Sequence, residues 1–322
     1  MQRPLATSQK SATPGIIDTI AAGLSVALAH PLLMAVPMLL DLYYWIGWRL
    51  APIALTDRLQ EIVVDADPAD RQQIIDSLHD AGGWDLTYLI AMFVPSMLGG
   101  LDRGALYEVW SRPAVTPDQW WLVCLVGFAM IVVAGGAFMA YAVPLADAAV
   151  GRARTVGQIA RAVLAAWFRF LGLLVLLIGL VVLVGGPVLI ATGIFLAMGI
   201  NLAPLLGAIA FPLGIAAAIF LYFMFDAIVV LEVGPLRAVY YSFNVVRRNF
   251  WPTVGFIMAA LVITLGLPEI WARLVDSPAG LFLAVIAHAF FAGGLAMASM
   301  IFFNDRLRLW RPDVAIQPTA SS

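Results

Sequence analysis

Charged side chains are scarce in this sequence. Asp, Glu, Lys and Arg make up 12% of its 322 residues, against roughly 25% in ordinary soluble domains. Hydrophobic residues reach 62%, and the mean hydropathy is +0.94. A soluble core cannot account for so much apolar side-chain surface. The composition therefore excludes an ordinary soluble domain and predicts an integral membrane protein.

Cysteine and histidine are also rare, with one Cys and three His. The single cysteine, Cys124, excludes an intrachain disulfide and a cysteine-based metal site, and we expect it to be a small buried apolar residue. The sequence has no His-Glu-x-x-His motif, no Gly-x-Ser-x-Gly motif, no phosphate-binding loop and no basic patch interleaved with aromatic residues. We therefore expect no catalytic residue set, no metal, no cofactor and no nucleic-acid partner.

What the sequence does contain is long apolar runs. Residues 170–225 include no Asp, Glu, Lys or Arg, whereas a helix needs only about 20 residues to cross a bilayer. This run must cross twice, and we expect the turn near Gly199, Asn201 and Pro204. Backbone groups in lipid must bond within the protein, and the alternating pattern of a membrane barrel is missing. We therefore predict an all-α integral membrane fold.

About six transmembrane helices account for the apolar runs. The first has an alternative, because 19–40 is also free of charged residues and could cross in place of 31–48. The predicted spans are 31–48, 119–145, 170–197, 202–225, 253–274 and 278–303.

Positive charges place both termini in the cytoplasm, because translocating cationic loops is disfavoured. With six spans, the cytoplasmic segments hold Arg3, Lys10, Arg152, Arg154, Arg161, Arg169, Arg237, Arg247, Arg248, Arg306, Arg308 and Arg311. The large external segment, 49–118, is acidic. Within it, 57–80 has the pattern of one or two amphipathic helices, and 87–101 is an apolar stretch interrupted by Pro95. We interpret 87–101 as interfacial or re-entrant; if it crosses instead, the amino terminus lies outside.

An internal repeat is predicted from two similar motifs. The motif AGGAFMA at 134–140 resembles AGGLAMA at 292–298, and an aspartate follows the first glycine of each at the same distance. The evenly spaced residues, 79 positions apart, are Gly135, Gly214 and Gly293, and likewise Asp147, Asp226 and Asp305.

A second repeated element precedes three of the spans. Segments beginning near Ile20, Ile159 and Val239 place apolar or small residues on one helix face, and we interpret them as interfacial elbow helices. Each unit is then an elbow followed by a helical hairpin, and the three units share one orientation about an axis along the membrane normal. The predicted boundaries are a cytoplasmic tail at 1–16, units at 17–150, 151–230 and 231–310, and a cytoplasmic tail at 311–322, with the acidic external insert at about 49–118 in the first unit.

Ionisable residues within spans are candidates for function, because each costs roughly 2.5–3.5 kcal/mol at a helix centre. Asp147, Asp226 and Asp305 could form a ring of carboxylates around a cytoplasmic vestibule that binds a cation or relays protons. The alternative, which we favour, is that they pair with arginines near the helix ends and orient the elbows. The arginines suited to this are Arg152, Arg237 and Arg308.

Asp41, Glu269 and His288 complete the candidate polar residues. Asp41 precedes the aromatic residues of the outer interface and could reach water there. Glu269 lies four residues before Arg273, which places the two to pair on one helix face. His288 has apolar neighbours, and we expect a hydrogen-bonded packing residue rather than a proton relay.

Two tracts resemble a known family. Residues 226–250, DAIVVLEVGPLRAVYYSFNVVRRNF, and 151–162, GRARTVGQIARA, are similar to tracts between spans in bacterial polytopic proteins related to the membrane domain of glycerophosphoryl diester phosphodiesterases. The resemblance covers about 140–310 and implies a multi-pass protein of a bacterial cytoplasmic (inner) membrane. No family catalytic residue maps onto this chain, so the resemblance does not imply phosphodiesterase activity.

The sequence thus predicts a non-enzymatic membrane protein that contacts the lipid bilayer and binds or moves a lipid or small solute, or scaffolds a protein partner. The alternative is a membrane-embedded enzyme or enzyme subunit of lipid metabolism, with Asp147, Asp226 or His288 as acid or base. A cavity between the helices would favour binding or transport, and a solid apolar centre would count against transport.

Overall fold

The computed structural model describes residues 14–63, 72, 75, 76, 85–90, 93–96, 113–274 and 277–316. Its helices are α1 (Ile16–Ala29), η1 (Pro31–Met34), α2 (Ala35–Ile46), α3 (Ile53–Val63), η2 (Leu86–Leu89), α6 (Trp120–Val150), α7 (Val156–Ala197), α8 (Ala203–Phe220), α9 (Met224–Val230), α10 (Pro235–Arg248), α11 (Phe250–Ala272) and α12 (Pro278–Trp310). Two short strands, β1 (Arg49–Leu50) and β2 (Ala114–Val115), pair in parallel.

The predicted all-α multi-pass fold is confirmed. Five of the described helices are long and apolar enough to cross a membrane, and a bent pair at the amino-terminal end makes a sixth if it counts as one span. The predicted spans from residue 119 onward coincide with α6, the apolar part of α7, α8, α11 and α12. The bent pair joins α1 to η1 and α2 at an angle of 95°. This bend falls at His30, where the sequence separates the first elbow from the first span.

The second predicted elbow is not a separate helix. It is continuous with the following span in α7, which runs for 42 residues. Proline explains the difference. Pro31 disfavours helical geometry at His30, which precedes it. Pro252, in the first turn of α11, has no N–H to donate to the carbonyl oxygen of Arg248, the last residue of the third elbow. No proline occurs near Arg169, the corresponding position of the second elbow. The helix therefore continues without a break.

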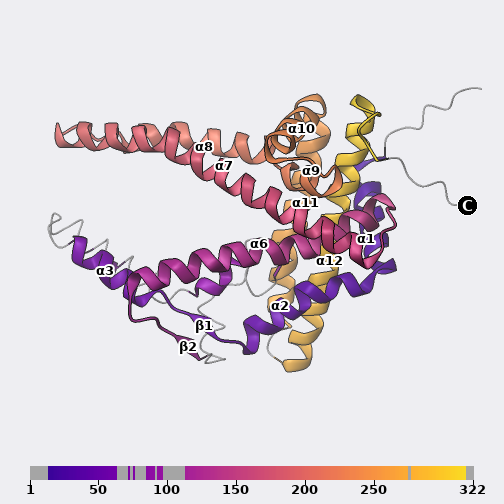
Figure 1. Ribbon diagram of the computed structural model, residues 1–322, viewed down its shortest axis with the longest axis horizontal. Coiled ribbons are helices and arrows are strands. Elements are labelled where there is room, and N and C mark those ends of the chain that lie inside the picture. Colours follow the sequence, from indigo (N-terminus) through magenta and orange to yellow (C-terminus); the bar gives the residue numbers. More distant parts are fainter. Residues whose placement is uncertain are drawn as a thin grey trace, which may run out of the picture.

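The long helices run in different directions. Figure 1 shows α7 and α8 extending to the left, away from the region where α1, α9, α10, α11 and α12 gather. In the same view α11 and α12 run from top to bottom, across the direction of α6. The equivalence of the three predicted units stays a prediction.

The repeated glycines make unequal contacts. A Cβ added to Gly135 would lie 2.3 Å from the Phe170 ring, and one added to Gly293 would lie 2.2 Å from the Met34 sulfur. A Cβ added to Gly214 would meet nothing within 4 Å. The even spacing of these glycines therefore does not mark one shared helix contact.

The closest helix contact joins α1 to α12. A Cβ on Gly23 would lie 2.4 Å from the carbonyl oxygen of Gly294 and 2.5 Å from the backbone nitrogen of Ala298. Glycine at such a position lets two helix backbones approach one another, which is the usual role of small residues between membrane helices. Farther along α12, buried phenylalanines pack it against α11, with ring centroids 4.7 Å apart for Phe256 and Phe302.

The two ends of the external insert are tied together. Arg49 of β1 pairs with Ala114 of β2, and the Asp85 carboxylate accepts hydrogen bonds from the backbone N–H groups of Leu50 (3.0 Å) and Thr87 (2.9 Å). Of the predicted segment 57–80, the structure describes 57–63, which belong to the helix α3, and 72, 75 and 76; of 87–101 it describes 87–90 and 93–96.

Cys124, predicted to be buried, is exposed on α6. Its neighbours Leu125 and Phe128 are exposed as well, so this part of α6 belongs to the apolar outer surface rather than to the protein core.

Replacing Gly23 by alanine should destabilise the protein, because the new Cβ would overlap backbone atoms of α12 that cannot swing aside. Overpacking of this kind costs about 1–3 kcal/mol. The measurement is the midpoint of thermal unfolding in lipid nanodiscs. Gly214→Ala is the matched control, because its Cβ has open space and alanine favours a helix over glycine by about 1 kcal/mol. Equal midpoints for the two variants would contradict the close contact.

Candidate functional site

A cavity of about 680 Å³ lies between α6, α9, α11 and α12, and it brings together Asp226, Glu269 and His288. We call it the polar cavity. Its volume is within the usual range for small-molecule sites, about 300–1,000 Å³. Its described lining consists of Pro95, Ser96, Phe138, Tyr222, Phe225, Asp226, Ala260, Ile263, Thr264, Leu265, Leu267, Pro268, Glu269, His288, Phe291, Ala292, Leu295, Ala296, Ser299 and Met300.

A helix break places Asp226 at this cavity. The predicted span 202–225 is interrupted after Phe220, and α9 begins at Met224. Ser242 of α10 seals the break: its hydroxyl donates to the carbonyl oxygen of Phe220 at 2.8 Å and accepts from the N–H of Phe223 at 3.1 Å. Such breaks are tolerated in membrane helices where other groups satisfy the freed backbone. Asp226 consequently lies in the first turn of α9.

Asp226 is buried and bonds to α12 rather than to an arginine. Its Oδ2 accepts a hydrogen bond from the Ser299 hydroxyl at 2.5 Å. The predicted alternative partner, Arg237, is exposed on α10 instead. Among the residues that the structure describes, Asp226 has no ion pair, so the prediction of an arginine partner is wrong for this aspartate.

His288 lines the polar cavity from α12 and is only 7% exposed. Its Nδ1 has no hydrogen-bond partner in the described part of the chain. The prediction of a hydrogen-bonded packing histidine is therefore wrong for this nitrogen. The physical reason is that the lining residues one turn away, Phe291 and Ala292, offer no polar side chain. A buried unpaired nitrogen at a cavity wall is a group that a ligand or water can satisfy.

Glu269 and Asp41 lie at the edge of the same region. Glu269 is exposed near the end of α11 and lines the polar cavity. Within the described ranges it has no ion pair with Arg273, the residue that follows α11. Asp41 is fully buried and accepts a hydrogen bond from Ser96, a lining residue, at 2.5 Å. The expectation that Asp41 reaches water is therefore wrong, because its side chain is buried and bonded to Ser96.

Asp147 belongs to a separate ion-pair cluster. Its Oδ1 lies 3.2 Å from Arg152 and its Oδ2 lies 3.6 Å from Arg154. Both arginines also pair with Glu232, which lies in the turn between α9 and α10. Arg152 donates a further hydrogen bond to the carbonyl oxygen of Val230 at 2.7 Å. The cluster joins the chain after α6 to the chain after α9, as the favoured structural interpretation of Asp147 predicts.

The cluster also bears on the backbone conformation of Glu232 and on the pKa of Arg154. Glu232 has φ +56°, a left-handed conformation that a non-glycine residue adopts at a cost of about 1–3 kcal/mol. Its pairing with two arginines offsets that cost. Burial lowers the pKa of Arg154, and the neighbouring Asp147 carboxylate raises it.

The three repeated aspartates do not form a ring around one vestibule. Asp305 lies 3.5 Å from Arg308 on α12. Asp147, Asp226 and Asp305 line three different cavities. The break after α8 directs Asp226 toward α12, whereas Asp147 and Asp305 lie beside arginines near the ends of α6 and α12. The ring hypothesis is therefore wrong.

Several important residues were missed by the sequence reasoning. Ser299 had a detectable signal, because it lies eleven positions after His288 and therefore on the same face of α12. Ser242 and Glu232 had no such signal in the sequence, because their partners come from distant segments of the chain.

The described lining is suited to binding a hydrogen-bond donor or a cation. Its ionisable side chains are Tyr222, Asp226, Glu269 and His288, and the lining that the structure describes includes no Arg or Lys. Among the described residues there is no group of three or more His, Cys, Asp or Glu side chains that could hold a metal ion. The chemistry available is therefore hydrogen bonding, charge pairing and apolar contact.

Asp147→Asn should destabilise the protein more than Asp305→Asn. The Asp147 side chain is 8% exposed and has two arginine partners, whereas the Asp305 side chain is 22% exposed and has one partner at 3.5 Å. We expect losses of about 3 kcal/mol for a broken buried pair and about 1 kcal/mol or less for the more exposed one. Thermal unfolding in nanodiscs measures both, and a larger loss for Asp305→Asn would contradict the assignment.

Comparison of the chain with protein-family models, with characterised proteins and with solved structures finds no match, so the resemblance to the membrane domains of glycerophosphoryl diester phosphodiesterases stays a prediction.

Proposed function

We propose that this chain is a non-enzymatic, multi-pass membrane protein that binds a lipid or small solute in the polar cavity. The observation that supports this most is the cavity itself. A solid apolar centre would have argued against a ligand, but here about 680 Å³ lies beside buried polar groups. Pockets that combine a mostly apolar wall with a few converging polar groups are typical of small-molecule sites.

The polar groups of the cavity favour binding because they are incompletely satisfied. Asp226 receives its hydrogen bond from Ser299, and His288 Nδ1 has no partner among the described residues. A buried polar atom without a partner costs about 1–3 kcal/mol. A ligand that supplies the missing hydrogen bond recovers this free energy on binding.

An enzyme of lipid metabolism is the second candidate, because Asp226 and His288 face the same cavity. A carboxylate and an imidazole in one pocket can act as a general acid and a general base. Lipid analysis of cells that carry Asp226→Asn separates the two functions. An enzyme would leave an accumulated substrate, whereas a binding protein would leave the cellular lipids chemically unchanged.

Occupancy of the polar cavity can be tested with Ala292→Trp, which fills the cavity from α12. Native mass spectrometry of protein released from native-membrane nanodiscs should detect a bound molecule on the unmodified protein and about ten-fold less on the variant, as expected for a loss of about 1.4 kcal/mol. Ala208→Trp on the exposed surface of α8 is the control and should retain the ligand. Equal occupancy in all three proteins, or none in any, would overturn the proposal.

We further propose that the protein lies in a bacterial cytoplasmic membrane with both termini in the cytoplasm, as the placement of Arg and Lys favours. Alkaline phosphatase fused after Ala81 should be active, because this enzyme works outside the cytoplasm. Green fluorescent protein fused after Arg311 should fluoresce, because it requires the cytoplasm to fold. An external carboxyl terminus would contradict the six-span arrangement.

A further inference from the structure

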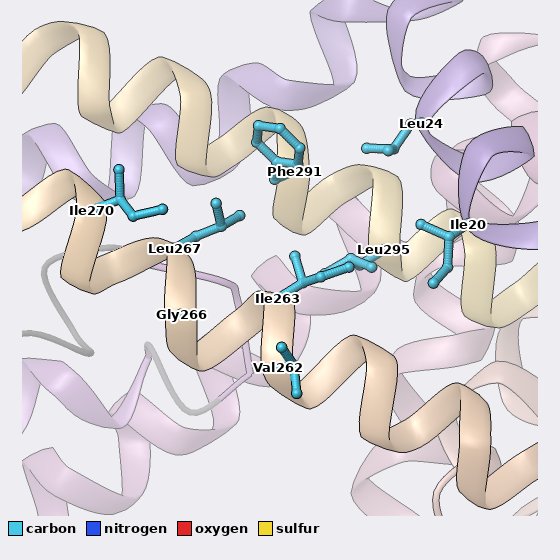
Figure 2. Close-up of a pocket in the computed structure, with 9 residues that line it drawn as sticks. All are labelled: Ile20, Leu24, Val262, Ile263, Gly266, Leu267, Ile270, Phe291 and Leu295. Atoms are coloured by element: carbon cyan, nitrogen blue, oxygen red, sulfur yellow. The ribbon is translucent and has the colours of Figure 1, made fainter. Parts of the chain in front are cut away.

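A second hollow, the apolar groove, lies between α1, α11 and α12. It has a volume of about 310 Å³, and its described lining consists of Ile20, Leu24, Val262, Ile263, Gly266, Leu267, Ile270, Phe291 and Leu295. Figure 2 shows side chains of α11 and α12 projecting into the space between the two helices, with Ile20 and Leu24 of α1 approaching from the side. Val262 is 67% exposed and Ile270 is 57% exposed, so the groove opens onto the apolar outer surface.

The apolar groove and the polar cavity meet at one wall. Ile263 and Leu267 of α11 and Phe291 and Leu295 of α12 line both spaces. These side chains belong to the region where α11 and α12 approach each other (Figure 2). A molecule that lies between the two helices and displaces these side chains would place an apolar chain in the groove and a polar group in the cavity.

Charge decides which polar group fits. The described lining of the polar cavity has two carboxylates, Asp226 and Glu269, and no Arg or Lys that could pair with a phosphate, sulfate or carboxylate. An uncompensated carboxylate in a membrane interior is costly. An ammonium group removes that cost by pairing with it and donates hydrogen bonds to the carboxylate oxygens.

We propose that the ligand is a cationic amphiphile, with its ammonium group at Asp226 and its single alkyl chain in the apolar groove. This inference rests on the proposed function, because it names the class of ligand that the polar cavity binds. A zwitterionic phospholipid fits less well, because the described lining offers no cation for its phosphate. The bilayer delivers the ligand, because the groove opens toward the lipid.

The test measures binding of radiolabelled dodecylammonium (protonated dodecylamine) and radiolabelled dodecanoate to the full chain in phosphatidylcholine nanodiscs, with empty nanodiscs as the background. The unmodified protein should bind the ammonium probe saturably and should show no saturable binding of dodecanoate. Asp226→Asn should weaken ammonium binding about ten-fold or more, as expected for loss of a charge-assisted contact. The Asn side chain can still accept the Ser299 hydrogen bond, so the variant should fold.

A substitution at Gly266 tests whether the alkyl chain of the ligand lies in the apolar groove. A Cβ at this position meets nothing within 4 Å, so Gly266→Trp should fill the groove without disturbing the helix. It should weaken ammonium binding about ten-fold. Gly193→Trp is the matched control, because Gly193 of α7 also has open space and lies away from the groove; its affinity should stay within about two-fold of the unmodified protein.

Two outcomes would overturn the inference. One is saturable binding of dodecanoate as strong as that of the ammonium probe, and the other is unchanged ammonium affinity in both Asp226→Asn and Gly266→Trp. If the protein from native membranes retains a ligand that Ala292→Trp loses, yet the ammonium probe does not bind, the ligand class is wrong and the proposed function stands. Thermal unfolding of each variant shows whether a loss of binding comes from a loss of folding.

Discussion

A polar group surrounded by hydrocarbon must find its partner within the protein, and most of the polar geometry of this chain follows from that constraint. Where α8 ends, the hydroxyl of Ser242 bonds to the backbone that the helix break releases. After α6 and α9, Arg152 and Arg154 share the carboxylates of Asp147 and Glu232. These contacts fix the helices and turns relative to one another.

In the polar cavity, by contrast, the ionisable groups have no ion-pair partner in the described structure. His288 Nδ1 lacks a partner in the described structure, and the buried Asp226 carboxylate is bonded to a neutral hydroxyl rather than to a cation. α12 links this region to the scaffold. Its glycines, Gly293 and Gly294, lie against η1 and α1 on one side, and its polar residues face the cavity on another. The close glycine contacts therefore hold in place the helix that supplies much of the cavity wall.

Bilayer thickness made the spans predictable, because it sets the length of an apolar helix whatever its neighbours are. The extent of α6, α11 and α12 could therefore be read from the apolar runs. The break after Phe220 could not, because it depends on Ser242 from a later helix. Local spacing likewise predicted the pairing of Asp147 with Arg152 but not with Glu232. The environment of His288 depends on how α11 and α12 pack, which no local pattern reveals.

The ion-paired Asp147 and the unpaired Asp226 lie in two separate parts of the molecule. The ion-pair cluster around Asp147 stabilises the turns that follow α6 and α9. We propose that the polar cavity and the apolar groove together bind one ligand, with its charged group in the cavity and its apolar chain in the groove. The most direct test of ligand binding at that site is a cryo-electron microscopy map of the protein in nanodiscs cut from the native membrane. We expect ligand density beside Asp226 that continues between α11 and α12. A cavity filled by protein side chains, with α11 packed against α12 along the whole groove, would contradict it.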